Sequence, residues 1–312
     1  NTDHVNCQVI HGDYIWIGTD GGIVKINTST GETWYLNSGN SGLEQNNVQC
    51  LEADNAGNIW VGNLGTTTCG GLSSFHGDSW TYYDPPQNYK KYSSITANTS
   101  NDVWVSTRLS GLFHYHNSEW EVFNYENSPL PTNSIGKVVI ENDGTIWAVV
   151  FEQLYTEGCL AKYDGNNWEL FNTSNSGIPS NYLTSIAIDN QGNIWIGTHE
   201  GLCVFDGYNW NIYNTGSSEI PENHITTIAC DMDNNIWIGT YESGIAGFDG
   251  DEWVVYNDTN SILPGNYIKA LAIDGINQLW ILNHLTYHQP GQVISFDGNS
   301  TWNYYEIKNS PL

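Results

Sequence analysis

Positively charged side chains are scarce in this chain. Its 312 residues include 8 Lys plus Arg against 34 Asp plus Glu, which gives a formal net charge of −26 at pH 7. A surface this acidic repels phosphate backbones and anionic lipid headgroups. The composition therefore argues against nucleic acid and against bare membrane as partners.

Long apolar runs are also missing. The stretch from Ile146 to Phe151 is among the longest, far short of the roughly 20 residues that a membrane-spanning helix needs. No segment carries apolar residues at a 3.6-residue spacing, which excludes stacked helical repeats. No secretory leader is recognisable and the first residue is Asn1, which fits a mature secreted form or an excised domain. We expect a secreted, periplasmic or cell-surface protein with no direct membrane insertion.

Sequence motifs of enzymes and cofactor sites are absent. There is no Gly-x-Ser-x-Gly elbow, phosphate-binding loop, dinucleotide fingerprint or Cys-x-x-Cys pair. We therefore expect no catalytic residues, no metal and no cofactor. One alternative stays open, which is Ca²⁺ bound at a turn: Asp231 starts a segment like an EF-hand loop, although Ile236 stands where that loop has Gly. His284 and His288 are four residues apart, a spacing that needs a helix to share a metal, and none is predicted here.

The six cysteines fall into two groups. Cys7, Cys50, Cys203 and Cys230 lie inside apolar strand patterns, which predicts buried free thiols. Cys69 and Cys159 lie at the start of predicted strands, where a disulfide stays an open alternative.

What the sequence has in abundance is a repeated tryptophan motif. Its clearest copies read Asn-Ile-Trp-Ile-Gly-Thr at 193–198 and 235–240. The first tryptophan of the motif recurs at spacings of 44, 44, 43, 48, 42 and 43 residues, at Trp16, Trp60, Trp104, Trp147, Trp195, Trp237 and Trp280. A second tryptophan follows each of them, at Trp34, Trp80, Trp120, Trp168, Trp210, Trp253 and Trp302. The two sets include all 14 tryptophans of the chain. Self-similarity at this period indicates a repeat architecture.

Each repeat predicts four short strands. In the fifth repeat we expect strands over 183–188, 194–197 and 201–205, and a fourth around Trp210 and Tyr213. Turns rich in Gly and Asn separate them, because these residues adopt positive φ at little cost. Four strands in a unit of about 40–45 residues are typical of a propeller blade.

We therefore predict an all-β fold, a single seven-bladed β-propeller of four-stranded antiparallel blades over residues 1–312. The expected blades are approximately 1–40, 41–84, 85–127, 128–175, 176–217, 218–260 and 261–312. The two ends of the chain together resemble one of the connections between blades, so we expect blade seven to meet blade one without an exchanged strand. A closure shifted by one strand stays an alternative.

The repeat resembles the two-component regulator propeller repeat. The likeness rests on Asn-Ile-Trp-Ile-Gly-Thr, a following Gly-Leu or Gly-Gly-Ile, Phe-Asp-Gly, and a preceding Leu-Pro-x-Asn. It is strongest over 192–207 and 234–250, whereas Ser106 and Leu282 depart from the pattern. The resemblance implies a propeller fold and a role as an extracellular or periplasmic sensor domain, often one that reads glycans.

The loops between strands predict where a ligand binds. We name the strands of a blade A to D in chain order. The A–B and C–D turns, which share one face of the ring (the turn face), hardly vary between repeats. The B–C and D–A loops share the other face (the loop face), and the B–C loops vary, which is typical of binding surfaces on rigid scaffolds. The candidate ligand-binding residues are Arg108, Phe151, Glu152, Tyr155, His199, Glu200, Tyr241, Glu242, His284 and Tyr287.

Aromatic rings, carboxylates and one Arg suit a polar ligand that contains rings. We expect a non-catalytic recognition or sensor propeller that binds a glycan or a peptide on the loop face. Two alternatives stay open. One is a structural subunit or adhesin of a cell-surface assembly, with other protein subunits as partners. The other is a lyase or hydrolase that uses Glu152, Glu200 and Glu242 on that face.

Overall fold

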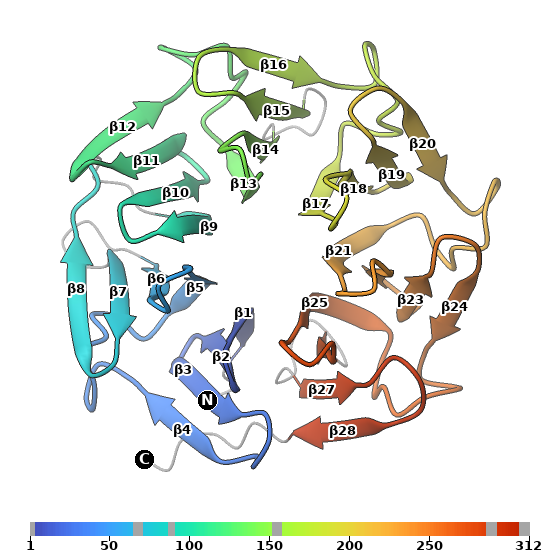
Figure 1. Ribbon diagram of the computed structural model, residues 1–312, viewed down its shortest axis with the longest axis horizontal. Coiled ribbons are helices and arrows are strands. Elements are labelled where there is room, and N and C mark those ends of the chain that lie inside the picture. Colours follow the sequence, from blue (N-terminus) through green and yellow to red (C-terminus); the bar gives the residue numbers. More distant parts are fainter. Residues whose placement is uncertain (1–3, 65–70, 87–90, 152–157, 285–291, 306–312) are drawn as a thin grey trace.

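Seven four-stranded antiparallel sheets surround a central axis in the computed structural model (Figure 1). The structure describes residues 4–64, 71–86, 91–151, 158–284 and 292–305. Strand A of each blade lies nearest the axis and strand D forms the outer edge. The strands of blades one to seven, in the order A to D, are β1 (Val5–His11), β2 (Tyr14–Thr19), β3 (Gly22–Asn27) and β4 (Thr33–Leu36); β5 (Val48–Ala53), β6 (Ile59–Asn63), β7 (Leu72–His76) and β8 (Ser79–Tyr83); β9 (Tyr92–Thr99), β10 (Asp102–Thr107), β11 (Leu112–His116) and β12 (Glu119–Phe123); β13 (Ile135–Ile140), β14 (Ile146–Val150), β15 (Cys159–Tyr163) and β16 (Trp168–Phe171); β17 (Leu183–Ile188), β18 (Ile194–Thr198), β19 (Gly201–Phe205) and β20 (Trp210–Tyr213); β21 (Ile225–Cys230), β22 (Ile236–Thr240), β23 (Ile245–Phe248) and β24 (Trp253–Tyr256); β25 (Tyr267–Ile273), β26 (Leu279–His284), β27 (Gln292–Phe296) and β28 (Trp302–Tyr305). The predicted fold class is confirmed.

The ring closes between blade seven and blade one without an exchanged strand. Each sheet takes its four strands from one continuous part of the chain. At the seam, Ile15 and Ile17 of blade one pack with Trp280 and Leu282 of blade seven. The side chain of Gln8 also donates a hydrogen bond of 3.2 Å to the carbonyl of Trp280. Apolar packing therefore joins these two blades, as it does the others.

The hydrophobic core is divided among the junctions between blades. Each of the seven clusters of buried residues draws its members from two adjacent blades. The first tryptophan of each repeat lies in such a cluster and is at most 6% exposed. The second tryptophan lies on strand D and is only partly buried. The first set therefore forms the core, and the second set covers its outer edge.

The repeated Asp of the A–B turn holds both the turn and the tryptophan. In blade five, Oδ1 of Asp189 accepts hydrogen bonds of 2.9 Å from the backbone N–H groups of Gln191 and Asn193. Its Oδ2 accepts a bond of 2.9 Å from Nε1 of Trp195. The same indole bond occurs at Trp60–Asp54, Trp237–Asp231 and Trp280–Asp274. A buried indole N–H needs a partner, which explains why Asp and Trp recur together.

The Gly of the Trp-Ile-Gly-Thr motif leaves room for the next blade. A Cβ at Gly239 would lie 2.6 Å from Cγ2 of Ile268, on strand A of blade seven. In blade three Ser106 takes this position, and the neighbouring strand has Gly136, whose carbonyl accepts a 2.5 Å hydrogen bond from the Ser106 hydroxyl. The side chain of Ser106 thus bonds to the backbone of strand A in the next blade.

The described cysteines carry free thiols. Cys50, Cys159 and Cys203 are buried, while Cys7 and Cys230 are partly exposed. Burial raises the pKa of Cys7, Cys159 and Cys230 to about 12. The prediction of free thiols in strands is confirmed for Cys7, Cys50, Cys203 and Cys230, and Cys69 lies outside the described residues. In the described part of the chain, no helix is long and apolar enough to cross a membrane.

Candidate functional site

In blades one, three, five and six the base of the B–C loop on the loop face is fixed by a Thr, the last residue of the repeat motif. In blade five the Thr198 hydroxyl donates a 2.8 Å hydrogen bond to the carbonyl of Gly201, and it accepts one from the N–H of Glu200. Thr240 makes the equivalent pair of bonds in blade six, to Gly244 and from Ser243. The loops therefore vary on a rigid support.

The residue after this position is held against the residue that precedes strand A. The backbone N–H of His199 donates to the carbonyl of Tyr182 at 3.1 Å, and that of Tyr241 donates to the carbonyl of His224 at 3.2 Å. Equivalent bonds join Asp20 to His4, Leu64 to Asn47, Arg108 to Lys91, and Phe151 to Ser134. In blade seven, Tyr267 and His284 are opposite each other in the β25–β26 ladder. These backbone pairs, one in each blade, form a ring on the loop face.

Five aromatic side chains of this ring stand in a continuous row. Ring centroids are 5.1 Å apart for Tyr182–His199, 3.9 Å for His199–His224, 4.8 Å for His224–Tyr241 and 5.4 Å for Tyr241–Tyr267. The row, which we call the aromatic row, runs across blades five, six and seven. Tyr182 is 36% exposed and Tyr241 is 40% exposed, so a ligand on the loop face can reach them.

The two imidazoles of the aromatic row are electrostatically similar. Burial lowers the pKa of His199, and the nearby His224 lowers it further. Burial also lowers the pKa of His224, against the opposing effect of Glu222 and Glu242. Both rings are therefore neutral at pH 7, and each offers one N–H donor and one nitrogen acceptor.

Two basic groups from different blades, Arg108 and Lys269, lie near enough to affect each other's charge. Arg108 of blade three is exposed, and Lys91 is its backbone partner. The pKa of Lys269, on the inner strand β25, is lowered chiefly by burial and then by the positive charge of Arg108. In a chain with a net charge of −26, this grouping of cations near the axis stands out.

The structure brings some of the predicted site residues together and separates others. His199 and Tyr241 belong to the aromatic row, and Glu200 and Glu242 follow them as exposed residues. Phe151 differs, because its ring lies against Gly136 and packs on the core between blades four and five. The backbone of His284 ends β26 beside Tyr267. Glu152, Tyr155 and Tyr287 lie outside the described residues.

Tyr182, His224 and Tyr267 are site residues that the sequence analysis missed. Each follows an Asn whose Oδ1 accepts a hydrogen bond from the backbone of the loop that enters its blade. The signal was therefore an aromatic residue after the repeated Asn of the D–A loop, namely Asn181, Asn223 and Asn266. The strand pairing places these rings beside the B–C loops.

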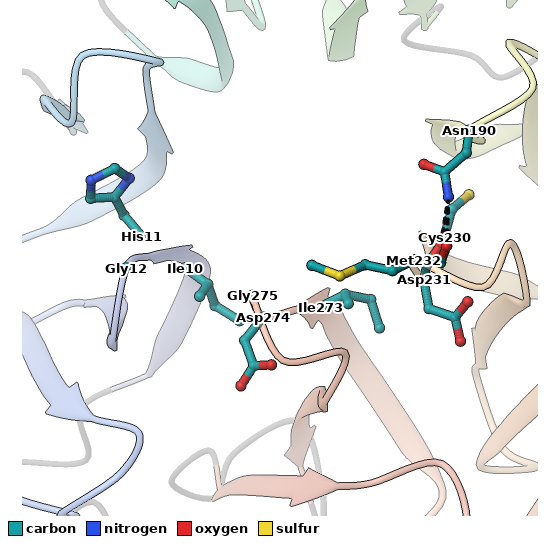
Figure 2. A pocket seen from close by; sticks show the side chains of 10 residues that line it. All are labelled: Ile10, His11, Gly12, Asn190, Cys230, Asp231, Met232, Ile273, Asp274 and Gly275. Carbon is teal, nitrogen blue, oxygen red and sulfur yellow. Dashed lines mark hydrogen bonds between the residues drawn. The ribbon is translucent and has the colours of Figure 1, made fainter.

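A cavity of about 370 Å³ lies on the turn face, where the turns hardly vary between repeats (Figure 2). Residues of the A–B turns of blades one, five, six and seven line it, among them His11, Asn190, Met232 and Gly275. The Asn190 amide donates a 3.0 Å hydrogen bond to the carbonyl of Asp231 and so links two neighbouring turns. This face is therefore less uniform than the repeated turn sequences indicated.

The turn that resembles a calcium loop uses its first carboxylate internally. Oδ1 of Asp231 accepts from the backbone of Asp233 and Asn235, and Oδ2 accepts from the amide of Asn235 and the indole of Trp237. A Ca²⁺ ion would have to compete with these four hydrogen bonds.

Comparison with known families gives the same repeat. A model described as two component regulator propeller matches residues 42–65, 177–200 and 219–242. Each match covers a D–A connection, strands A and B, and the start of the B–C loop. The chain is a seven-bladed propeller in which three segments match the two component regulator propeller repeat. Among curated proteins, no significant match to this chain was found.

Solved structures similar to this chain include proteins with different described roles. One is an extracellular domain assigned to a hybrid two component system of B. thetaiotaomicron, with 16% identity and a TM-score of 0.55 over 95% of this chain and 50% of that one. Another is PorZ, a surface component of the type-IX secretion system of Porphyromonas gingivalis, with 16% identity and a TM-score of 0.67 over 88% and 44%. This chain spans about half the length of these two proteins. A third is an inactive virginiamycin B lyase from Staphylococcus aureus with quinupristin, with 12% identity and a TM-score of 0.70 over 90% and 92%. At these identities the likeness shows a shared fold.

Proposed function

We propose that this propeller is a non-catalytic recognition domain that acts outside the cytoplasm and binds an oligosaccharide on its loop face. The observation that carries the proposal is the aromatic row, with centroids no more than 5.4 Å apart between neighbours. Two similar propellers, an extracellular domain and a bacterial surface component, support the location.

The chemistry of the aromatic row favours sugars over charged ligands. Neighbouring rings of the row cover each other's faces, with His224 and Tyr241 stacked at 8°, so a sugar would contact the outer faces and the polar edges of the row. The exposed carboxylates of Glu200 and Glu242 accept hydrogen bonds from hydroxyl groups at the edge of the row. Because both histidines are neutral, no buried charge opposes the approach of an uncharged chain.

Arg108, which follows β10 in blade three and lies outside the blades of the aromatic row, favours an acidic group at one end of the ligand. Arg108 presents a planar guanidinium, which pairs with carboxylates through two parallel hydrogen bonds. An oligosaccharide that contains a uronic acid would place sugar rings on the row and its carboxylate toward Arg108.

The experiment is a screen of the purified chain on an array of neutral and uronic-acid oligosaccharides, with a peptide library in parallel. The best binder is then titrated against Tyr241→Ala and His199→Ala. We expect each variant to weaken binding by about tenfold or more, since truncating a central aromatic contact removes over 1 kcal/mol.

Tyr208→Ala is the matched control. Tyr208 is 91% exposed and lies in a C–D turn, on the turn face. Its variant should bind like the wild-type chain. Equal affinity of the Tyr241, His199 and Tyr208 variants would refute the site, and selective binding of peptides through Tyr241 would refute the sugar class while keeping the site.

The non-catalytic part of the proposal needs a separate measurement. The lyase with the same fold shows that propellers also support elimination chemistry. The best binder is therefore incubated with the chain and analysed by mass spectrometry. Recovery of the intact compound is expected, and cleavage that is lost in His199→Ala would overturn this part.

A further inference from the structure

Among the described residues, blade three carries the one group of three side chains that could hold a metal ion together. His114 and His116 are two residues apart on β11 and therefore point to the same face of the sheet. In the strand pairing, Glu121 is opposite His114 and Asp102 is opposite His116, and residues opposite each other share a face. The sheet thus gathers two imidazoles between two carboxylates on one side of the blade.

The distances within this group suit a shared ion. One ligand atom each from His114, His116 and Glu121 lie within 4.8 Å of one another. Two ligands of a tetrahedral Zn²⁺ ion with bonds near 2.1 Å are about 3.4 Å apart. His116 and Glu121 have side chains 39% and 50% exposed, so small rotations can close the remaining gap.

His114 is already oriented as metal-binding histidines are. Its ring is stacked on Trp104, with centroids 3.8 Å apart and an interplanar angle of 10°. Its Nε2 is 2.9 Å from Oδ1 of Asp102, whose Oδ2 accepts a hydrogen bond of 3.3 Å from Asn98. A carboxylate that fixes the ring of a ligating histidine is the usual outer partner in such sites.

The equivalent positions in other blades show that the group is not a by-product of the repeat. In blade two, His76 occupies the position of His116, but Ser74 replaces His114 and Thr81 replaces Glu121. The turn Asp that binds the tryptophan indole in blades two, five, six and seven is also missing from blade three, where Asn98 begins the A–B turn.

We propose that His114, His116 and Glu121 form a binding site for one divalent transition metal ion, with Asp102 orienting His114. Two imidazoles and a carboxylate select Zn²⁺, Cu²⁺ or Ni²⁺ over Ca²⁺ and Mg²⁺, which prefer oxygen ligands alone. The site lies on the side of blade three, apart from the aromatic row, so it does not depend on the proposed sugar binding.

The test is isothermal titration of the full chain with ZnCl₂ at pH 7.5 in the presence of excess Ca²⁺, which occupies unspecific acidic sites. We expect one Zn²⁺ per chain, and a loss of affinity of about tenfold or more in His116→Ala and in Glu121→Gln. His76→Ala is the matched control and should leave the affinity unchanged. His116 and His76 are each the last residue of a strand. Thermal unfolding without metal checks that each variant is folded.

A spectroscopic measurement identifies the ligands directly. Cu²⁺ bound to the chain should give an electron paramagnetic resonance signal with coupling to two imidazole nitrogens, reduced to one in His116→Ala. Wild-type-like Zn²⁺ affinity in His116→Ala, or a Cu²⁺ signal unchanged by that substitution, would overturn the proposal.

Discussion

His199 and His224, from adjacent blades, have ring centroids only 3.9 Å apart on the loop face. The pKa of each is lowered, chiefly by burial, and the charge of His224 lowers that of His199 further. An unfolded chain therefore binds more protons than the folded chain once the pH falls below about 6.5. Folding stability contributed by these neutral rings is present above that pH and is lost as the pH falls through their folded pKa values.

Imidazole titration by NMR tests this relationship. We expect both midpoints below the ordinary value of 6.5, and a higher midpoint for His199 in His224→Gln, because one source of repulsion is removed. The fall in melting temperature on acidification should be smaller in that variant. A midpoint for His199 at or above 6.5 in the wild-type chain would contradict the prediction.

Gly239→Ala should destabilise the fold. The added Cβ would lie 2.6 Å from Cγ2 of both Ile268 and Thr227, so two packed inner strands would have to separate. Overpacking of this kind costs about 1–3 kcal/mol, which urea denaturation detects. Gly275→Ala is the control, because a Cβ there meets nothing within 4 Å. Equal midpoints for the two variants would show that Gly239 has another role.

Asp189→Ala should have a comparable effect for a different reason. The change leaves the backbone of Gln191 and Asn193 and the buried indole N–H of Trp195 without their acceptor. Unsatisfied buried donors make a loss of about 2–3 kcal/mol in unfolding free energy reasonable. Asp206→Ala, in an exposed C–D turn, should cost clearly less, and the near-ultraviolet circular dichroism spectrum should change more in the Asp189 variant than in the Asp206 variant.

The sequence predicted the blade because its structural residues repeat. Trp195, Gly197 and Thr198 make equivalent contacts in most blades, so each recurs at a fixed offset and reports the fold. The aromatic row was only half predicted, since Tyr182 and His224 reach the B–C loops through strand pairing that has no signature of its own in the sequence. Phe151 is an aromatic residue in a B–C loop and so looked like a site residue, but its ring packs against Gly136.

The group in blade three shows the same limit. His114 and His116 are near each other in the sequence, but Asp102 and Glu121 join them only through the register of three strands. A search for metal ligands at helical or loop spacing therefore passes over them. Alternation along a predicted strand, combined with the offset between strands, was the signal that could have found the cluster.

The carboxyl group of Glu52, inside the ring, should make the unfolding free energy depend on pH. It lies on the inner strand β5, and burial raises its pKa to about 7, against the opposing charge of Lys137. The folded chain therefore holds a proton that the unfolded chain releases above about 4.5, and stability falls as the pH rises from 4.5 to 7.

Glu52→Gln should remove this loss. Relative to wild type, the variant should gain up to about 3 kcal/mol in unfolding free energy between pH 5 and pH 8. Chemical denaturation at several pH values measures the difference. Glu169→Gln, on the exposed face of β16, should follow the wild-type profile. Parallel profiles for wild type and Glu52→Gln would contradict the assignment.

The division of the core among the junctions has a consequence for cooperativity. Trp60 of blade two packs with Phe113 of blade three, and Trp104 of blade three packs with Ile146 of blade four. Unfolding of a single blade would thus expose two of these clusters to solvent. In a closed ring, neither neighbouring blade has a free end at which local unfolding could begin. An open array of repeats can melt from its termini, one unit after another. In this closed ring we expect all seven sheets to unfold together, in one cooperative transition.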